Sequence, residues 1–232
     1  LDGIKALKLL AEENANDKEL DMRIQQLLSD GPDKPFLDIY FKDHNHGLAV
    51  GAYGLAFVTD DGGITWVPAL DRIPNRDERH LYIIHENSDG LFIGGEQGRL
   101  WRSEDNGRSF ARLDTPFGNS IFDLSTTSKG ELIAVGLGGK LHKSSDAGRT
   151  WSTSQPAGDA TLSTAVDLKG SLVIAGTSGQ LLISRDGAQK FELLAQLQFP
   201  VTDLAPNEHG ELVVVGPNGV HTVDVPFWPS TK

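Results

Sequence analysis

The chain has 232 residues, of which 38% are hydrophobic and 26 are glycine, and its formal net charge is −11. This acidity argues against nonspecific binding to nucleic acid or to an anionic lipid surface, because both reward a basic face. The absence of cysteine excludes disulfides, thiol catalysis and cysteine-ligated zinc, and no apolar run approaches the roughly 20 residues that a membrane-spanning helix needs.

Residues 1–34 differ in pattern from the rest of the chain. Apolar residues recur at helical spacing over 20–28 and, in a shorter segment, over 4–11. Asn16 and Glu19 are predicted to form a capping pair, and a Ser-Asp-Gly-Pro sequence supplies a stop. We expect a helical arm that packs on the sheets, with docking of a partner protein as the alternative.

From residue 35 onward the hydrophobic period falls to 2, which indicates β-strands. Five units follow, and in each a short apolar run leads into a pair of glycines: Gly51 and Gly54, Gly95 and Gly98, Gly136 and Gly139, Gly176 and Gly179, Gly216 and Gly219. A phosphate-binding glycine loop would open a helix, whereas a second strand is predicted after each of these pairs. The glycine pairs are therefore predicted to be hairpin turns.

A second motif closes each of the first four units: a hydroxyl residue, an aspartate, a glycine, a second hydroxyl and an aromatic residue, with a worn fourth copy. Its aspartates are 44, 41 and 40 residues apart, and its main positions are Asp61, Gly63, Trp66, Asp105, Gly107, Phe110, Asp146, Gly148, Trp151, Asp186 and Phe191. We expect each carboxylate to accept amide hydrogen bonds from its own turn and each ring to enter a layer between sheets. A calcium loop would need more carboxylates at alternating positions.

Four strands repeating about every 40 residues are typical of propeller blades. The prediction is an all-β fold, a β-propeller of four-stranded blades over 35–228, preceded by the helical segment 1–34. The predicted blades are 35–70, 79–115, 119–155, 160–196 and 199–226. Because the fifth unit lacks the aspartate turn and an outer strand, we expect five blades of a seven-bladed parent, with a complete five-bladed ring as the alternative.

The motif itself resembles the Asp-box, or BNR repeat, of sialidases, sortilin-type receptors and other propellers. The combination of residues 47–54 with residues 59–66 looks like the Ycf48/HCF136-type photosystem II stability and assembly factors and their non-photosynthetic bacterial relatives. This resemblance covers residues 36–225. It implies an exported seven-bladed propeller that assists a membrane complex without turning over a substrate, and it implies that the helical segment is an insertion between blades.

The same resemblance implies that arginine side chains bind the partner. Photosynthetic members carry an arginine-rich face for their partner, and the dense arginine group of this acidic chain is Arg72, Arg76 and Arg79. These residues lie in the longest connection between predicted blades, 68–80, and long loops on rigid scaffolds commonly carry contacts. We expect them to bind a protein partner; solvent-facing salt bridges are the alternative.

The competing hypothesis is that the chain is an enzyme of a class that contains Asp-boxes, a sialidase or another glycoside hydrolase. Such an enzyme needs an arginine triad, a tyrosine nucleophile with a glutamate partner, and an acid–base aspartate. The chain offers Tyr40, Tyr53 and Tyr82, and its Arg72-Ile73-Pro74 element follows a box, whereas the sialidase element precedes the first one. No catalytic residue is assigned.

Two further groups of polar residues have structural interpretations. Residues 43–46 hold two histidines beside an aspartate, but no third metal ligand is indicated, which favours a solvated hairpin. Asp38, Asp123 and Asp203 occupy matching positions on predicted inner strands, where they form an acidic mouth or satisfy strand ends. No metal and no cofactor is predicted.

These observations predict a non-enzymatic, bacterial propeller scaffold, periplasmic or otherwise exported, that serves as an assembly or stability factor for a membrane protein complex. Its expected partner is a protein of that complex and not nucleic acid, and the chain itself is not expected to span the membrane. The alternatives are a sialidase-like glycoside hydrolase and a propeller that binds carbohydrate or peptide.

Overall fold

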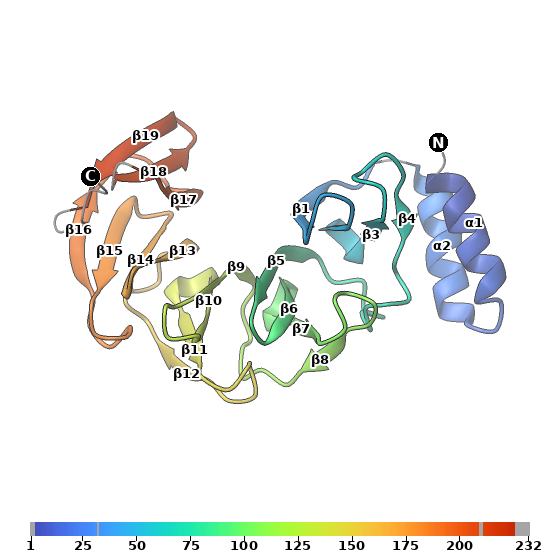
Figure 1. Ribbon diagram of the computed structural model, residues 1–232, viewed down its shortest axis with the longest axis horizontal. Coiled ribbons are helices and arrows are strands. Elements are labelled where there is room, and N and C mark those ends of the chain that lie inside the picture. Colours follow the sequence, from blue (N-terminus) through green and yellow to red (C-terminus); the bar gives the residue numbers. More distant parts are fainter. Residues whose placement is uncertain (1–2, 32, 209–210, 226–232) are drawn as a thin grey trace. The chain divides into compact units, whose positions relative to one another are not determined.

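The computed structural model describes residues 3–31, 33–208 and 211–225, which form two α-helices and five antiparallel sheets (Figure 1). The chain divides into two compact units. The first unit contains both helices and the first two sheets, and the second unit contains the other three sheets. None of the described helices is long and apolar enough to cross a membrane.

The N-terminal helices are α1 (Gly3–Glu13) and α2 (Lys18–Asp30). The predicted capping pair of Asn16 and Glu19 is wrong, because Asp17 caps α2: its carboxylate accepts the amides of Glu19 and Leu20 at 3.2 and 3.1 Å. Gly31, with a φ of 75°, ends the helix where the stop was expected. Helix α1 lies against α2 and β4 (Figure 1).

The sheets of the first unit have four strands each, in sequence order. The first contains β1 (Phe36–Phe41), β2 (Gly47–Gly51), β3 (Ala56–Thr59) and β4 (Val67–Pro68), and the second contains β5 (Leu81–Asn87), β6 (Gly90–Gly95), β7 (Leu100–Ser103) and β8 (Ala111–Leu113). We call them blade 1 and blade 2. Short 3-10 segments, η1 (Ala52–Gly54) and η2 (Glu96–Gly98), join the second strand to the third.

The second unit continues the repeat. Blade 3 contains β9 (Ile121–Thr126), β10 (Leu132–Gly136), β11 (Leu141–Ser144) and β12 (Ser152–Ser154), with η3 (Leu137–Gly139) as its turn. Blade 4 contains β13 (Leu162–Leu168), β14 (Ser171–Gly176), β15 (Gln180–Ser184) and β16 (Glu192–Gln196). Blade 5 contains β17 (Asp203–Pro206), β18 (Glu211–Gly216) and β19 (Gly219–Asp224), and it has three strands within the described residues.

The core of the first unit joins the helical arm to both blades. Leu20 and Ile24 of α2 pack with Leu70 and Ile73 of the connection after blade 1, in one buried apolar cluster that also contains strands of both sheets. The largest side chain of this core is Trp101 of β7, which is 1% exposed. Burial of this cluster is the main driving force for holding the arm against the blades.

Candidate functional site

The repeated aspartate turns are closed by their own hydrogen bonds. In the second copy, Asp105 accepts the Ser103 hydroxyl at 2.7 Å, the Ser109 amide at 2.9 Å and the Ser109 hydroxyl at 2.6 Å. The Ser103 hydroxyl in turn accepts the amide of Gly107 at 2.8 Å. These donors stabilise the ionised form, so that the Ser109 hydroxyl first, and its amide second, lower the pKa of Asp105.

The other copies repeat this geometry with one informative difference. Asp61 and Asp146 accept the same three groups over 2.6–2.8 Å, and the hydroxyl and amide of Thr150 lower the pKa of Asp146 to about 2. In the worn copy, Lys190 stands where the others have a hydroxyl residue, and Asp186 accepts its amide at 3.0 Å instead. Each carboxylate is therefore occupied within its own turn, which makes these aspartates poor candidates for catalysis.

The aromatic residues that follow the turns are anchored in two ways. The indole nitrogens of Trp66 and Trp151 donate to the carbonyls of Gly63 and Gly148, at 3.2 and 3.0 Å. Phe110 is buried, and its amide donates to the Arg72 carbonyl at 2.9 Å. Phe191 is half-buried against the core shared by blades 3 and 4.

The connection between blades 1 and 2 carries the three arginines, and the structure gives each a different environment. Arg76 pairs with Glu19 of α2 at 2.9 Å, and Arg79 pairs with Glu96 at 3.5 Å. Arg72 lines a cavity, and the described part of the chain holds no ion-pair partner for it. The three guanidinium groups therefore have no shared partner.

This connection is held rigidly by buried polar contacts. Asn75 is 5% exposed, and its side chain both donates to the Arg79 carbonyl at 2.8 Å and accepts the Arg79 amide at 3.1 Å. The Trp101 indole donates to the carbonyl of Pro74 at 3.2 Å. Neither contact follows from the repeat pattern.

A buried arginine attaches the helical arm to blade 1. Arg23 of α2 donates through Nη2 to the carbonyls of Gly54 at 2.5 Å and Tyr53 at 3.3 Å. Burial lowers the pKa of Arg23, and the nearby Glu78 carboxylate partly offsets this effect. Gly54 is required at this contact, since a Cβ atom there would lie 2.6 Å from the guanidinium nitrogen, and its φ is +69°. The position of Arg23 in the sequence does not by itself reveal this contact.

The inner-strand aspartates connect neighbouring blades. Asp38 accepts the amide of Ile84 at 2.6 Å, which joins blade 1 to blade 2. Asp123 accepts the amide of Ala165 at 2.8 Å, which joins blade 3 to blade 4. Asp203 accepts the hydroxyl of Thr164 at 3.1 Å, which joins blade 5 to blade 4. Of the two predicted roles, these contacts favour satisfaction of strand groups over an acidic mouth.

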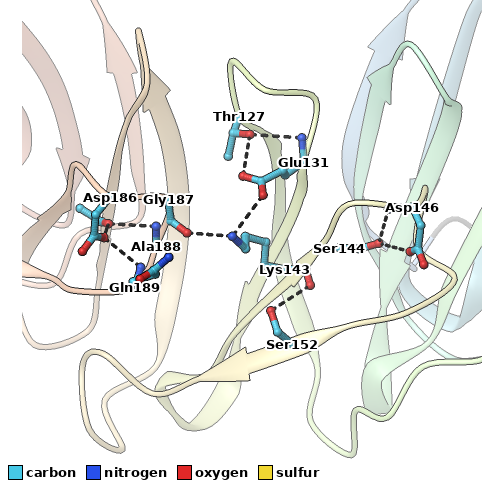
Figure 2. Close-up of polar contacts among 11 residues, drawn as sticks. Thr127, Glu131, Lys143, Ser144, Asp146, Ser152, Asp186, Gly187, Ala188 and Gln189 are labelled. Carbon is cyan, nitrogen blue, oxygen red and sulfur yellow. Dashed lines mark hydrogen bonds and ion pairs between the residues drawn. The ribbon is translucent and has the colours of Figure 1, made fainter.

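A lysine also connects blade 3 to blade 4. Lys143 of β11 pairs with Glu131 at 3.1 Å and donates to the carbonyl of Gly187, in the worn aspartate turn of blade 4, at 2.8 Å. Figure 2 shows the ammonium group between these two acceptors, with Glu131 also held by Thr127. The space left beside this contact is only about 20 Å³.

The corresponding space between blades 1 and 2 is open. It is a cavity of about 550 Å³ bounded by the hairpin 42–46 of blade 1 and the aspartate turn 103–108 of blade 2. Its apolar floor includes Leu48, Val58 and Leu91. We call this cavity the blade 1–2 cleft.

The hairpin of the cleft contains the predicted histidine pair. Asp43 accepts the amides of Asn45 and His46 at 2.8 and 2.9 Å, and the His46 ring lies 2.8 Å from the same carboxylate. These contacts lower the pKa of Asp43 to about 2, with the Asn45 amide as the largest cause. No group of three histidine, cysteine or carboxylate side chains that could hold a metal ion occurs within the described ranges.

Comparisons with known proteins show what part of this chain is similar to. Residues 19–117 match the model of the family described as Photosynthesis system II assembly factor YCF48. A curated relative, the Photosystem II assembly lipoprotein Ycf48 of Synechococcus sp. (strain CC9902), is 29% identical over 120 residues, which are 51% of this chain and 36% of the relative. The predicted resemblance to the Ycf48 family is confirmed.

Solved structures of Ycf48 proteins have the same fold. YCF48 from Cyanidioschyzon merolae matches with a TM-score of 0.64 at 16% identity, over 86% of this chain and 70% of that chain. A structure described as YCF48 bound to D1 peptide matches with a TM-score of 0.60 at 16% identity, over 80% of this chain and 64% of that chain. These matches confirm the β-propeller fold.

The Ycf48-like segment includes the arginine connection and the cleft beside it. The family match over residues 19–117 contains all but the first residue of α2, blades 1 and 2, their connection and the blade 1–2 cleft. The chain spans about a third of the length of the curated Ycf48 relative.

Proposed function

We propose that this Ycf48-like chain is part of a non-enzymatic, exported propeller scaffold that binds a protein and helps to assemble or stabilise a membrane complex. The observation that carries the proposal is the contrast between its two sets of charged groups. The aspartates of the repeat are occupied within their own turns, whereas Arg72 of the family-matched segment stays unpaired at the edge of a cavity. A family relative described as bound to a peptide supports a protein partner.

The arginine connection is the proposed partner-binding segment. Arg76 is exposed, and its pair with Glu19 contributes little to stability because water screens it, so a partner can compete for it. Arg79 is more constrained, since its backbone is held by Asn75 and its guanidinium by Glu96. Arg72 is therefore the arginine that we expect to contribute most to binding.

Affinity capture tests this proposal. The full-length natural protein would be used to capture partners from membranes of its own source, and the Arg72→Glu, Arg76→Glu, Arg79→Glu triple variant would be compared with it. We expect the triple variant to lose most of the captured complex. Arg185→Glu is the matched control, because Arg185 is a paired surface arginine outside this segment. Equal capture by the triple variant and the control would contradict the assignment.

The competing enzyme hypothesis depends on tyrosine. Tyr40 and Glu86 both line the cleft, as a tyrosine nucleophile and its partner would. However, burial first, and the Glu86 carboxylate second, raise the pKa of Tyr40, which disfavours the ionised nucleophile. We infer that the chain is not a glycosidase. Hydrolysis of a fluorogenic sialoside by the full-length protein, abolished by Tyr40→Phe, would overturn this inference.

The proposed compartment is the periplasm of a bacterium or an equivalent exported location. The name of the curated relative, a lipoprotein, supports export of that protein. Fractionation of source cells with an antibody against this chain tests the proposal. Recovery in the periplasmic or membrane-peripheral fraction is the expected result, and recovery with cytoplasmic markers would contradict it.

A further inference from the structure

The turn between the second and third strands of blade 1 exposes a tyrosine where the other blades have small or polar residues. Tyr53 is the third residue of this turn, and its counterparts in blades 2–5 are Gln97, Gly138, Ser178 and Asn218. Its φ is 53°, a left-handed conformation in which a bulky residue is strained. Tyr53 is 50% exposed, so the core does not require its ring either. The tyrosine therefore needs an explanation outside the stability of the turn.

The ring of Tyr53 is held in place by its neighbours. Its backbone amide donates to Nδ1 of His80 at 3.1 Å, and the two rings make a T-shaped contact with centroids 4.9 Å apart. The imidazole in turn stacks on Tyr82 of β5, with centroids 6.0 Å apart. We call Tyr53, His80 and Tyr82 the aromatic row. Because these contacts already fix the rings, a ligand would not have to order them.

The polar atoms that the row leaves available can donate hydrogen bonds. Since Nδ1 of His80 accepts the Tyr53 amide, the neutral imidazole carries its proton on Nε2. Neither this Nε2 nor the Tyr53 hydroxyl has a hydrogen-bond partner among the residues that the structure describes. The neighbouring Glu96 carboxylate already accepts the His80 amide at 3.2 Å. The row can therefore bind carbonyl oxygens of a ligand.

The charges beside the row are paired within the protein. Lys34, whose ammonium group lies 5.5 Å from the centre of the Tyr53 ring, pairs with Asp30 and Asp33 at 2.6 and 3.0 Å. The guanidinium group of Arg79 pairs with Glu96 at 3.5 Å. A charged ligand would have to compete with these pairs. Aromatic surface and hydrogen-bond donors remain, and they suit an uncharged segment that presents apolar rings and carbonyl groups.

We propose that the aromatic row binds a proline-containing segment of a partner polypeptide in the polyproline II conformation. A proline ring of the segment packs on Tyr53, and its backbone carbonyls accept from the Tyr53 hydroxyl and from Nε2 of His80. Proline fits these donors because it has a carbonyl but no N–H, and exposed aromatic residues are the usual receptors for this conformation. The proposal rests on the protein-binding function above, since Arg79 of the arginine connection directly precedes His80.

Substitutions at Tyr53 test the proposal without loss of the fold. Tyr53→Gly removes the ring and suits the left-handed backbone, so the circular dichroism spectrum and the thermal midpoint of the parent should be retained. Tyr53→Phe keeps the ring and removes the hydroxyl group. Ile64→Ser is the matched control, because Ile64 is an apolar residue that is 84% exposed in the aspartate turn at the other end of β3.

The probe is a phage-displayed library of random peptides selected on the full-length protein. We expect enriched sequences to contain proline. In fluorescence anisotropy, a labelled enriched peptide should bind Tyr53→Gly at least about tenfold more weakly than the parent or Ile64→Ser, and Tyr53→Phe should lie between them. Exchange of the peptide's prolines for alanine should weaken its binding to the parent and abolish the difference between the parent and Tyr53→Gly. This exchange does not depend on the folding of any variant.

Three outcomes would overturn the proposal: no enrichment, enriched peptides without proline, or equal binding of the peptide to Tyr53→Gly and Ile64→Ser. Membrane capture with the same variants separates this proposal from the function on which it rests. If Tyr53→Gly loses the peptide but captures as much of the membrane complex as the parent, the protein-binding function stands and the row is not where that partner docks. Loss of both places the partner on the row. If the parent captures no complex, the protein-binding function fails, whatever the peptide does.

Discussion

Asp123 should make the stability of the second unit depend on pH. Its carboxylate accepts the amides of Ala165 and Leu124, both at 2.8 Å, and it lies near Asp203, whose carboxylate accepts the Thr164 hydroxyl. Burial is the main cause that raises the pKa of Asp123 to about 7, and the charge of Asp203 adds to it. The two amide hydrogen bonds oppose the shift without cancelling it.

The sign of the effect follows from the two protonation states. Below a pH of about 4 the carboxyl group is protonated in both the folded and the unfolded chain, so it carries no penalty. Between about 4 and 7 the unfolded chain has lost this proton while the folded chain keeps it, and stability falls as pH rises. Above about 7 the folded protein contains a buried carboxylate, and the penalty is constant.

The magnitude can be worked from the shift. A rise of about three pKa units corresponds to at most about 4 kcal/mol, and we expect about 2–4 kcal/mol because the shift is shared with Asp203. Asp123→Asn keeps an oxygen that accepts the Ala165 amide and removes the charge. The variant should therefore gain stability relative to the parent as pH rises from 4.5 to 8.

Chemical denaturation at a series of pH values measures this gain. The difference between variant and parent reports Asp123 together with its interaction with Asp203, since all more distant ionisable groups are common to both proteins. Asp114→Asn, a substitution at an exposed carboxylate of the same unit, is the control with which the Asp123→Asn difference is compared at each pH. If the Asp123→Asn difference is the same at pH 4.5 and pH 8, the assignment of a raised pKa to this group is wrong.

Three further substitutions test the contacts that join separate parts of the chain. Arg23→Met removes the donor to the Gly54 carbonyl and should cost about 1–3 kcal/mol, seen as faster hydrogen exchange in α2; unchanged exchange would contradict the clamp. Gly139→Ala places a Cβ atom 1.9 Å from the Gly158 carbonyl oxygen, at a residue whose φ is +67°. It should lower the free energy of unfolding by more than about 2 kcal/mol, and an unchanged thermal midpoint would refute the close approach. Lys143→Met should cost about 1–2 kcal/mol in chemical denaturation, and no loss would show that the lysine contact is neutral.

The repeated elements could be predicted because their interactions are local. In each aspartate turn the carboxylate bonds groups two to four residues away, so residue types at fixed spacing determine the geometry. The helical arm was predicted for a similar reason, from apolar residues one turn apart. The predicted N-cap of α2 was one residue too early. Asn16 and Asp17 are adjacent, and both are residue types that cap helices, so the sequence alone does not decide between them; in the structure Asp17 is the cap.

Contacts between distant segments could not be predicted in the same way. Arg23 bonds a carbonyl 31 residues away, and Lys143 bonds one 44 residues away. A weak signal for Arg23 was present, since it lies among Leu20, Ile24 and Leu27 on the apolar stripe of α2, where a charge needs a buried partner. The identity of that partner depends on the packing of the arm against blade 1, and it required the structure.

The arginine group illustrates a different limit of sequence reasoning. Three arginines within eight residues suggested one basic patch, but spacing along an irregular connection does not determine where side chains point. The structure gives Arg76 and Arg79 separate carboxylate partners and leaves Arg72 at the cleft. The three residues remain a proposed binding segment, and single substitutions should weaken binding unequally, with Arg72→Glu the most severe.

The departures from the repeat therefore carry more functional information than the repeat itself. The carboxylates that recur from blade to blade accept hydrogen bonds from the protein itself. Those of the aspartate turns bond their own turns, and those of the inner strands bond the neighbouring blade. A partner needs groups that such internal contacts leave available. Arg72 is one of them, because the described part of the chain holds no ion-pair partner for it and it lines the blade 1–2 cleft.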